Sequence, residues 1–182
     1  LVVRRGEEEL LPPEELAVPP GVLALSVLDL ERDGDPDVVL GIRGVGGADG
    51  SLRYLENRDG ALVLLAESLS LPEPPSTLAV GDVDGNGRED LVVGGLEDRA
   101  FVCLASGAGG FAEPVSFRTA MSPTIRLADL DGDEVLDFLV LGLAEEGIAI
   151  PLNDVVPPVS LDLDGNGVPD ECQRFPFHRG DP

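Results

Sequence analysis

Short apolar runs separated by turn-forming residues recur along the chain. Runs such as 22–28 (VLALSVL), 38–42 (VVLGI) and 91–95 (LVVGG) are bounded by Asp, Gly, Ser and Pro residues. Runs of this length between turn residues are typical of buried β-strands, because helices need longer segments with a 3.6-residue period. No convincing helical period is present, and the Glu-rich stretch 7–16 is interrupted by two prolines. The pattern therefore predicts an all-β protein.

The apolar runs are organised in repeated units of up to four. Each unit begins with one run, an acidic stretch and a second run, and then one or two further runs follow. The runs are 22–28, 38–42, 51–57 and 61–71 in the first unit, 76–80, 91–95, 100–106 and 111–119 in the second, and 124–128, 138–142 and 147–153 in the third. The acidic stretches begin at residues 29, 82 and 129, a spacing in the range of propeller blades. A four-stranded unit cannot cover its own two faces, so we expect neighbouring units to pack together.

The acidic stretch of each unit is nine residues long, and a fourth copy lies near the end of the sequence. The copies span 29–37, 82–90, 129–137 and 162–170, and the second reads DVDGNGRED. In every copy, positions 1, 3, 5 and 9 carry an oxygen-bearing side chain. These residues are Asp29, Glu31, Asp33 and Asp37; Asp82, Asp84, Asn86 and Asp90; Asp129, Asp131, Asp133 and Asp137; and Asp162, Asp164, Asn166 and Asp170.

This spacing matches the coordination chemistry of Ca²⁺. The ion takes six to eight oxygen ligands at about 2.3–2.6 Å, and a coiled loop directs side chains 1, 3 and 5 inward while position 7 offers its carbonyl. The expected backbone donors are Asp35, Arg88, Val135 and Val168. Mg²⁺ demands stricter geometry, and soft metals would need His or thiolate ligands. Turns without an ion are the alternative, since Asp, Asn and Gly favour turns, but four matching copies favour calcium.

The charge balance agrees with cation binding and argues against two classes of partner. The chain has 12 basic and 35 acidic residues, and its formal charge of −23 would destabilise a compact state unless cations screened or bound it. The same charge argues against nucleic acid and anionic membrane surfaces, and no apolar run is long enough for membrane insertion. No nucleophile elbow, phosphate loop or zinc-protease motif occurs, and the only histidine, His178, lies in the tail. We therefore expect no enzyme activity.

The second acidic stretch and its following strand resemble a known repeat. The segment 82–94, Asp-x-Asp-Gly-Asn-Gly-x-x-Asp-Leu-Val-Val-Gly, is similar to the FG-GAP/VCBS repeat of integrin α-chain propellers and of many secreted bacterial proteins. The segments 63–71 (VLLAESLSL) and 109–117 (GGFAEPVSF) resemble the outer strand of that repeat. The resemblance covers about residues 1–153. It implies calcium-stabilised β-propeller blades, commonly extracellular and used for adhesion or ligand presentation.

Two loops depart from the pattern of the family. Position 6 usually needs Gly for a sharp turn, as at Gly34, Gly87 and Gly167, but the third loop has Glu134 there. A left-handed backbone costs a non-Gly residue about 1 kcal/mol or more. The first loop has the longer Glu31 in place of Asp at position 3. We therefore expect the second loop to be the best calcium site of the blades and the third to be the weakest.

The expected fold is a partial β-propeller of about three four-stranded antiparallel blades with calcium-binding hairpin loops, followed by an irregular tail. Residues 1–153 form the blades, and 154–182 form the tail with the fourth loop. That loop resembles EF-hand-like or thrombospondin type 3 calcium motifs. Three blades do not close a ring, and 1–5 (LVVRR) looks like a strand left over from a preceding blade. We therefore expect a piece of a larger propeller, with further blades upstream or from another chain.

The leading functional hypothesis is a non-enzymatic calcium-binding segment of a secreted or cell-surface bacterial protein, which serves adhesion or scaffolding and binds a protein or glycan ligand. A carbohydrate-binding propeller is one alternative, although an aromatic content of 4% disfavours sugar stacking. An accessory region of a larger secreted enzyme is another. Cys103 and Cys172 form either one disulfide or two separate thiols. The tripeptide 179–181, Arg-Gly-Asp, matches an integrin-recognition sequence, which chance explains in a chain rich in these residues.

Overall fold

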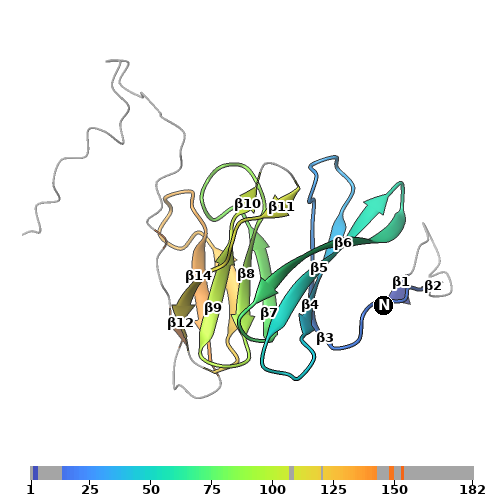
Figure 1. Ribbon diagram of the computed structural model, residues 1–182. Coiled ribbons are helices and arrows are strands. Elements are labelled where there is room, and N and C mark those ends of the chain that lie inside the picture. The colour runs from blue at the N-terminus through green and yellow to red at the C-terminus, as the bar shows by residue number, and fades with distance from the viewer. Residues whose placement is uncertain are drawn as a thin grey trace, which may run out of the picture.

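The described part of the chain consists of β-strands joined by turns and loops. The computed structural model describes residues 2–3, 14–106, 109–119, 121–142, 148–149 and 153. Within these residues every regular element is a strand, and most strands belong to three antiparallel sheets (Figure 1). This result confirms the predicted all-β fold class, a partial β-propeller of antiparallel blades.

The first sheet is a four-stranded meander, in which the strands lie side by side in chain order. Its strands are β3 (Val22–Leu28), β4 (Asp37–Arg43), β5 (Gly50–Arg58) and β6 (Ala61–Leu71). The first acidic loop joins β3 to β4 and is therefore a hairpin connection, as the sequence predicts. The two middle strands bury apolar side chains on both faces of the sheet, and Leu40, Leu52 and Leu55 are at most 1% exposed.

The second and third sheets repeat this arrangement. The second contains β7 (Pro75–Gly81), β8 (Asp90–Gly95), β9 (Arg99–Cys103) and β12 (Val115–Arg118), paired in that order. The third contains β13 (Thr124–Ala128), β14 (Asp137–Leu141) and β15 (Ile148–Ala149). The second and third acidic loops join the first two strands of their sheets. The three units predicted from the apolar runs are therefore the three main sheets.

Two short strand pairs accompany the main sheets. β10 (Ala105–Ser106) pairs with β11 (Gly110–Phe111), and the Phe111 ring stacks on Tyr54 of the first sheet with 5.8 Å between ring centroids. This small hairpin therefore joins the second unit to the first, and the apolar pattern does not predict it. β1 (Val2–Val3) pairs with β2 (Glu14–Glu15) on the side of the first sheet that lies away from the second (Figure 1).

The sheets pack face to face, with their first strands in contact. β7 lies against both β3 and β13, so the first strands of the three units are neighbours. Between the first and second sheets, Val39 and Leu52 pack with Leu91 and Phe101, all fully buried. Between the second and third, a separate cluster includes Val92 and Ile125. The apolar faces that one sheet cannot cover are thus buried against the next sheet.

Two glycines allow adjacent sheets to approach closely. A Cβ atom on Gly41 would lie 2.8 Å from Cγ of Pro75, the first residue of the next sheet. A Cβ atom on Gly94 would lie 2.8 Å from the carbonyl oxygen of Pro123, which precedes the third sheet. Real Cβ contacts are not this short, so both positions require glycine for the observed packing. We call Gly41 and Gly94 the glycine notches.

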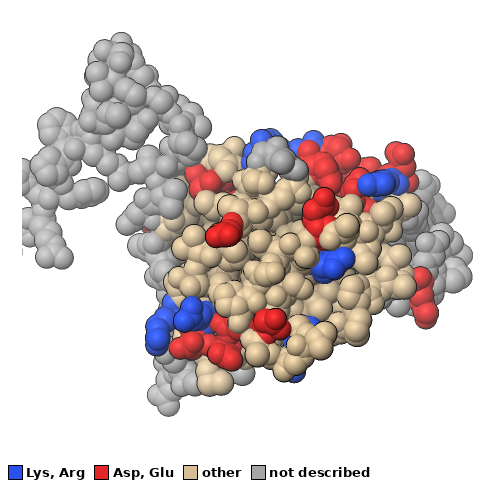
Figure 2. Space-filling view, viewed as in Figure 1, with Lys and Arg blue, Asp and Glu red and all other residues tan. Residues whose placement is uncertain are grey.

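The three acidic loops lie at the same end of the sheets. In Figure 1 the connections β3–β4, β7–β8 and β13–β14 are all at the upper end of the molecule. Figure 2, in the same view, shows many charged side chains along that upper edge and only scattered charges over the middle of the face. The sheets therefore act as a scaffold that presents the acidic loops together.

Candidate metal centres

Each acidic loop of the sheets turns sharply at position 6. Gly34, Gly87 and Glu134 have φ angles of 93°, 79° and 70°, all in the left-handed region. Glycine adopts this conformation at little cost, whereas Glu134 adopts it against its steric preference. The turn predicted at position 6 is therefore present in all three loops, including the one that lacks glycine.

The first carboxylate of each loop binds the backbone of the turn. In the second loop, Asp82 accepts hydrogen bonds from the N–H of Asn86 at 3.1 Å and of Gly87 at 2.7 Å. Asp29 accepts from the N–H of Asp33 and Gly34 in the same way. In the third loop, Asp129 accepts from the N–H of Gly132 and Glu134. The coiled path of each loop thus has its own hydrogen bonds.

The side chain at position 5 folds the loop back toward its second strand. The Oδ1 atom of Asn86 accepts the N–H of Arg88 at 2.8 Å. In the first loop Asp33 accepts from Asp35, and in the third Asp133 accepts from Val135, both at 2.9 Å. Position 7 is therefore held close to the side chain at position 5, while its role as a carbonyl ligand stays a prediction.

The aspartate at position 9 is buried and links the loop to the third strand of the sheet. Asp90 is 0% exposed, and its Oδ2 atom accepts the N–H of Val83 at 2.9 Å while Oδ1 accepts that of Ala105 at 2.7 Å. The other loops repeat both contacts. Asp37 accepts from Leu30 and Asn57, and Asp137 accepts from Leu130 and Asn153.

The residues that donate the second N–H group to each position 9 aspartate are not evident from the sequence pattern. Asn57, Ala105 and Asn153 occupy equivalent positions at or just beyond the third strand. They act through the backbone N–H, so side-chain type gives little signal at Ala105. Asn153 adds a side-chain contact, since its Nδ2 donates to the carbonyl oxygens of Val83 at 2.7 Å and Leu136 at 3.1 Å. It therefore joins the second loop to the third.

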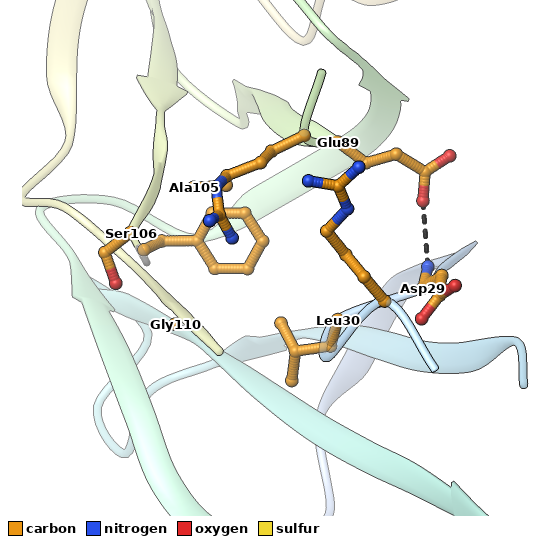
Figure 3. A pocket seen from close by; sticks show the side chains of 9 residues that line it. Asp29, Leu30, Glu89, Ala105, Ser106 and Gly110 are labelled. Carbon is orange, nitrogen blue, oxygen red and sulfur yellow. Dashed lines mark hydrogen bonds between the residues drawn. The ribbon is translucent and has the colours of Figure 1, made fainter. Parts of the chain in front are cut away.

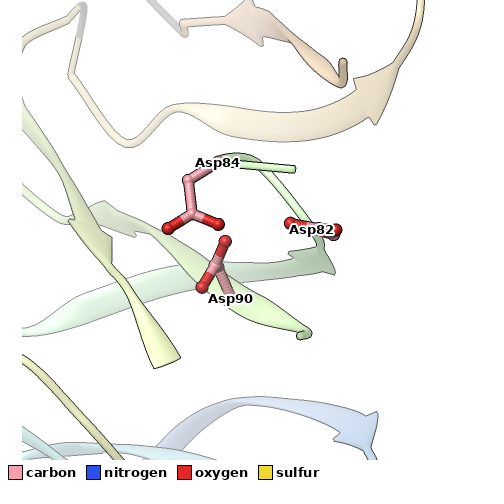
Figure 4. A group of neighbouring side chains, drawn as sticks. All are labelled: Asp82, Asp84 and Asp90. Atoms are coloured by element: carbon pink, nitrogen blue, oxygen red, sulfur yellow. The ribbon is translucent and has the colours of Figure 1, made fainter. Parts of the chain in front are cut away.

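Two of the loops gather three carboxylates each. One oxygen from each of Asp82, Asp84 and Asp90 lies within 4.8 Å of the others, and Figure 4 shows the side chains of Asp84 and Asp90 close together beside Asp82. Asp129, Asp131 and Asp137 form the equivalent group in the third loop. A donor set of carboxylate oxygens without thiolate or imidazole suits a hard cation such as Ca²⁺.

The proton affinities of these groups reflect burial and crowding. Burial raises the pKa of Asp90, and the negative charges of Asp84 and Asp82 add to this increase, whereas the hydrogen bonds from Ala105 and Val83 oppose it. Desolvation also raises the pKa of Asp131, and its carboxylate neighbours add to the effect. A cation between the carboxylates would relieve this repulsion.

The first loop differs because its third position is Glu31. Among the described residues, the first loop does not gather three carboxylates within 4.8 Å as the other two do. Glu31 is an exposed residue, but its carboxyl is partly desolvated. This desolvation, together with the nearby charge of Asp37, raises the pKa of Glu31 to about 7. The longer side chain thus places its carboxyl differently from those of Asp84 and Asp131. By this measure the first loop, not the third, departs most from the shared geometry, while the order of affinities stays a prediction.

Neighbouring loops touch each other. The N–H of Asp29 in the first loop donates to Glu89 in the second at 2.8 Å, as the dashed line in Figure 3 shows. Asp29, Leu30 and Glu89 line a cavity of about 10 Å³ together with Ser106 of the small hairpin. A cavity of this size has room for about one water molecule. The loops of adjacent sheets are therefore in direct contact.

Several predicted features lie outside the described residues. The fourth loop, with Asp162, Asp164, Asn166, Val168 and Asp170, is among them, as are Cys172 and 179–181. Cys103 is described and is 0% exposed, and it has no disulfide partner among the described residues. Burial raises the pKa of Cys103 to about 12, so the thiolate is strongly disfavoured. The predicted tail motif and a disulfide to Cys172 stay predictions.

Comparison with known proteins agrees with the repeat geometry. The FG-GAP-like repeat model matches residues 29–93 and again residues 82–140, so the two matches overlap at the second acidic loop. No curated protein matches the chain. Each match includes two consecutive acidic loops and the strands between them. The matches together cover more than half of the chain, which therefore belongs to the FG-GAP-like repeat family.

Proposed function

We propose that the chain is a non-enzymatic, calcium-binding repeat segment of a secreted or cell-surface bacterial protein, which serves adhesion or scaffolding. One observation carries the calcium assignment. In both the second and third loops, the carboxylates at positions 1, 3 and 9 converge to within 4.8 Å of one another. Three anionic groups at this distance repel each other, and a divalent cation among them converts the repulsion into attraction.

The residues of the loops define how the ion would be held. In the second loop Asp82, Asp84 and Asn86 would offer side-chain oxygens, Arg88 its carbonyl, and Asp90 a carboxylate that is already fixed by two backbone N–H groups. The third loop offers the same set with Asp133 and Val135. Calcium would fix the path of each loop between two strands of its sheet, so its role would be structural.

The family supports the location and the lack of catalysis. FG-GAP-like repeats are typical of extracellular domains and are generally non-catalytic, and the chain carries two matches to them. In the part of the chain that the structure describes, no helix is long and apolar enough to cross a membrane. The proposed ligand of the assembled protein is a protein or a glycan on another surface.

Calorimetric titration of chelator-treated protein with Ca²⁺ tests the proposal. We expect binding at two or more sites, with Mg²⁺ binding more weakly because it demands a stricter octahedral geometry. Asp84→Ala should remove one site, whereas Arg88→Ala should retain it, because position 7 contributes only its backbone carbonyl. The pair compares the loss of a side-chain ligand with the loss of a side chain that is not a ligand in the same loop. Absence of heat and of any spectroscopic change at millimolar Ca²⁺ would refute calcium binding.

A further inference from the structure

Exposed apolar side chains occupy the face of the first sheet that points away from the second. Leu25 is 54% exposed and Val27 is 52% exposed, both on β3. They pair across the sheet with Leu40 and Val38 of β4, and directly opposed residues of an antiparallel pair share one face. We call these four residues the outer face; Leu25 and Val27 are its exposed members, whereas Leu40 is 1% exposed. Grouped apolar exposure of this kind marks an interaction surface.

The repeat register shows what the outer face corresponds to in the other sheets. Counted back from position 1 of each acidic loop, Leu25 is equivalent to Leu78 and to Ile125. Leu78 is 8% exposed and packs in the core between the first and second sheets. Ile125 is 0% exposed and packs between the second and third. The same position is therefore an inter-sheet contact in two units and exposed to solvent only in the first.

Part of this side of the first sheet is already covered. Leu16 and Val18 pack with Leu40 and Ile42. These two residues directly follow β2, which pairs with β1. In the second unit, β9 pairs with β12, and the chain then leads into the first strand of the next sheet. The pair β1–β2 precedes β3 in the same way and so has the place of an outer strand pair.

We propose that the outer face binds the inner strand pair of one more FG-GAP-like blade, whose outer pair is β1–β2. The occupant is a β-hairpin with its own acidic loop, and it covers Leu25 and Val27. The added hairpin must present a face like that of the first sheet, which covers Leu78 of the second unit. That face of the first sheet contains the fully buried Val39 and the notch at Gly41, against which Pro75 packs. This contact between blades does not require metal binding.

The third sheet does not offer such a face, which argues against a second copy as the occupant. At the position of the glycine notches, the third sheet has Leu141, which is 49% exposed. At the position of Ser26 and Ala79 it has Arg126. A neighbour could not approach Leu141 as closely as Pro75 approaches Gly41. The surfaces at the two ends of the array are therefore different.

An extended chain tests the proposal. A copy of residues 75–98, which contains β7 and β8, is placed directly before Leu1, so that Leu1 follows it as Arg99 follows 98 in the second unit. Leu25→Ser is then compared in the 182-residue chain and in the extended chain by thermal unfolding. We expect the melting temperature to fall by at most about 2 °C in the former and by about 5 °C or more in the latter, because only the latter buries Leu25.

Two controls define the outcomes. Val45→Ser changes a fully exposed valine in a turn and should have the same small effect in both chains. Val92→Asp in the copied segment should abolish the extra sensitivity to Leu25→Ser, because the equivalent Val92 is fully buried between sheets. Equal effects of Leu25→Ser in both chains, including the case in which the added segment stays unfolded, would overturn the proposal. So would a dimer of the unextended chain that Leu25→Ser dissociates in sedimentation, since the occupant would then be a second copy.

Discussion

The carboxylate of Asp90 accepts the backbone N–H of Ala105 at 2.7 Å, which joins the second acidic loop to the start of β10, just beyond the third strand of its sheet. The second oxygen of Asp90 accepts the N–H of Val83 at 2.9 Å, within the loop. Asp90 is therefore both a member of the carboxylate group and a structural link. Full burial and a hydrogen bond that reaches beyond the loop distinguish position 9 from positions 1, 3 and 5, whose side chains are not fully buried.

Asp90→Ala should destabilise the protein even without calcium. The change leaves the N–H groups of Val83 and Ala105 without an acceptor at a buried site, which costs about 1–3 kcal/mol for each group. We expect the free energy of unfolding to fall by about 2–5 kcal/mol in urea denaturation with a chelator present. Asp84→Ala is the matched control, since Asp84 is partly exposed and bonds only within the loop. A similar loss in both variants would contradict the structural role of position 9.

Removal of calcium should lower the melting temperature. With a dissociation constant of about 10⁻⁴ M and free calcium of about 10⁻³ M, each site stabilises the fold by roughly 1.4 kcal/mol. The two carboxylate groups together would supply about 3 kcal/mol, which corresponds to about 5–12 °C. Thermal scans with and without chelator measure this difference, and added NaCl should recover only part of it by screening. Superimposed curves would identify the loops as turns without an ion.

Glu31→Asp should create a better calcium site in the first loop. The shorter side chain matches Asp84 and Asp131 at the same position and would allow its carboxyl to form a group with both Asp29 and Asp37, as in the other two loops. We expect calcium affinity at this loop to rise by about tenfold, or ~1.4 kcal/mol, in calorimetric titration. Glu67→Asp on β6 makes the same chemical change on an exposed strand position and should alter nothing. An unchanged titration of Glu31→Asp would show that the length of this side chain does not limit binding.

Gly41→Ala should weaken the contact between the first and second sheets. The new Cβ atom would lie 2.8 Å from Cγ of Pro75, whose ring cannot rotate away. We expect a loss of about 1–3 kcal/mol in the free energy of unfolding, as for other overpacked sites. Gly110→Ala provides the control, because a Cβ there would meet only Ser106 Oγ at 3.7 Å. Equal stabilities of the two variants would show that the sheets can separate slightly without cost.

Glu73 should make stability fall as the pH rises toward neutrality. Its side chain is buried between the first two units, Oε2 accepts the N–H of Glu97 at 2.6 Å, and Oε1 has no partner among the described residues. Burial raises the pKa of Glu73; nearby Glu97 and Asp98 add to the increase, and Arg99 opposes it. The protonated form is thus favoured in the fold, so its stabilising contribution is complete below the unfolded pKa and is lost as the pH rises through the folded pKa.

Glu73→Gln removes this titration and provides the measurement. We expect the stability of the variant relative to the wild type to increase as the pH rises, and the difference to shrink toward acid pH, where the wild-type carboxyl takes up its proton. Glu67→Gln, on the exposed strand β6, controls for the loss of one negative charge. If Glu67→Gln gives the same pH-dependent gain, net charge and not the buried Glu73 carboxyl is responsible.

The loops and strands were predictable because local chemistry determines them. Turn residues at fixed positions placed each acidic loop between two apolar runs, and the left-handed turn occurs even at Glu134, which is not glycine. The carboxylate groups of the second and third loops followed from the same spacing. Local pattern was sufficient wherever the structure repeats.

The remaining features depend on contacts that sequence spacing does not encode. Ala105 binds Asp90 through its backbone, so no side-chain type marks it. The hairpin β10–β11 has only two residues in each strand, too few to show a period. The burial of Glu73 results from the packing of two units, and the different geometry of the first loop results from one extra methylene in Glu31. These features became visible only in three dimensions.

The hydrogen bond from Asp29 to Glu89 means that adjacent loops would not bind calcium independently of each other. An ion that reshapes the second loop would also move the acceptor on which the first loop depends, and Asn153 links the third loop to the second in a similar way. Calcium binding at one loop would then affect the next loop along the array. Binding at one loop would therefore change the calcium affinity of the adjacent loop, and damage to one loop would be felt mainly by its immediate neighbours.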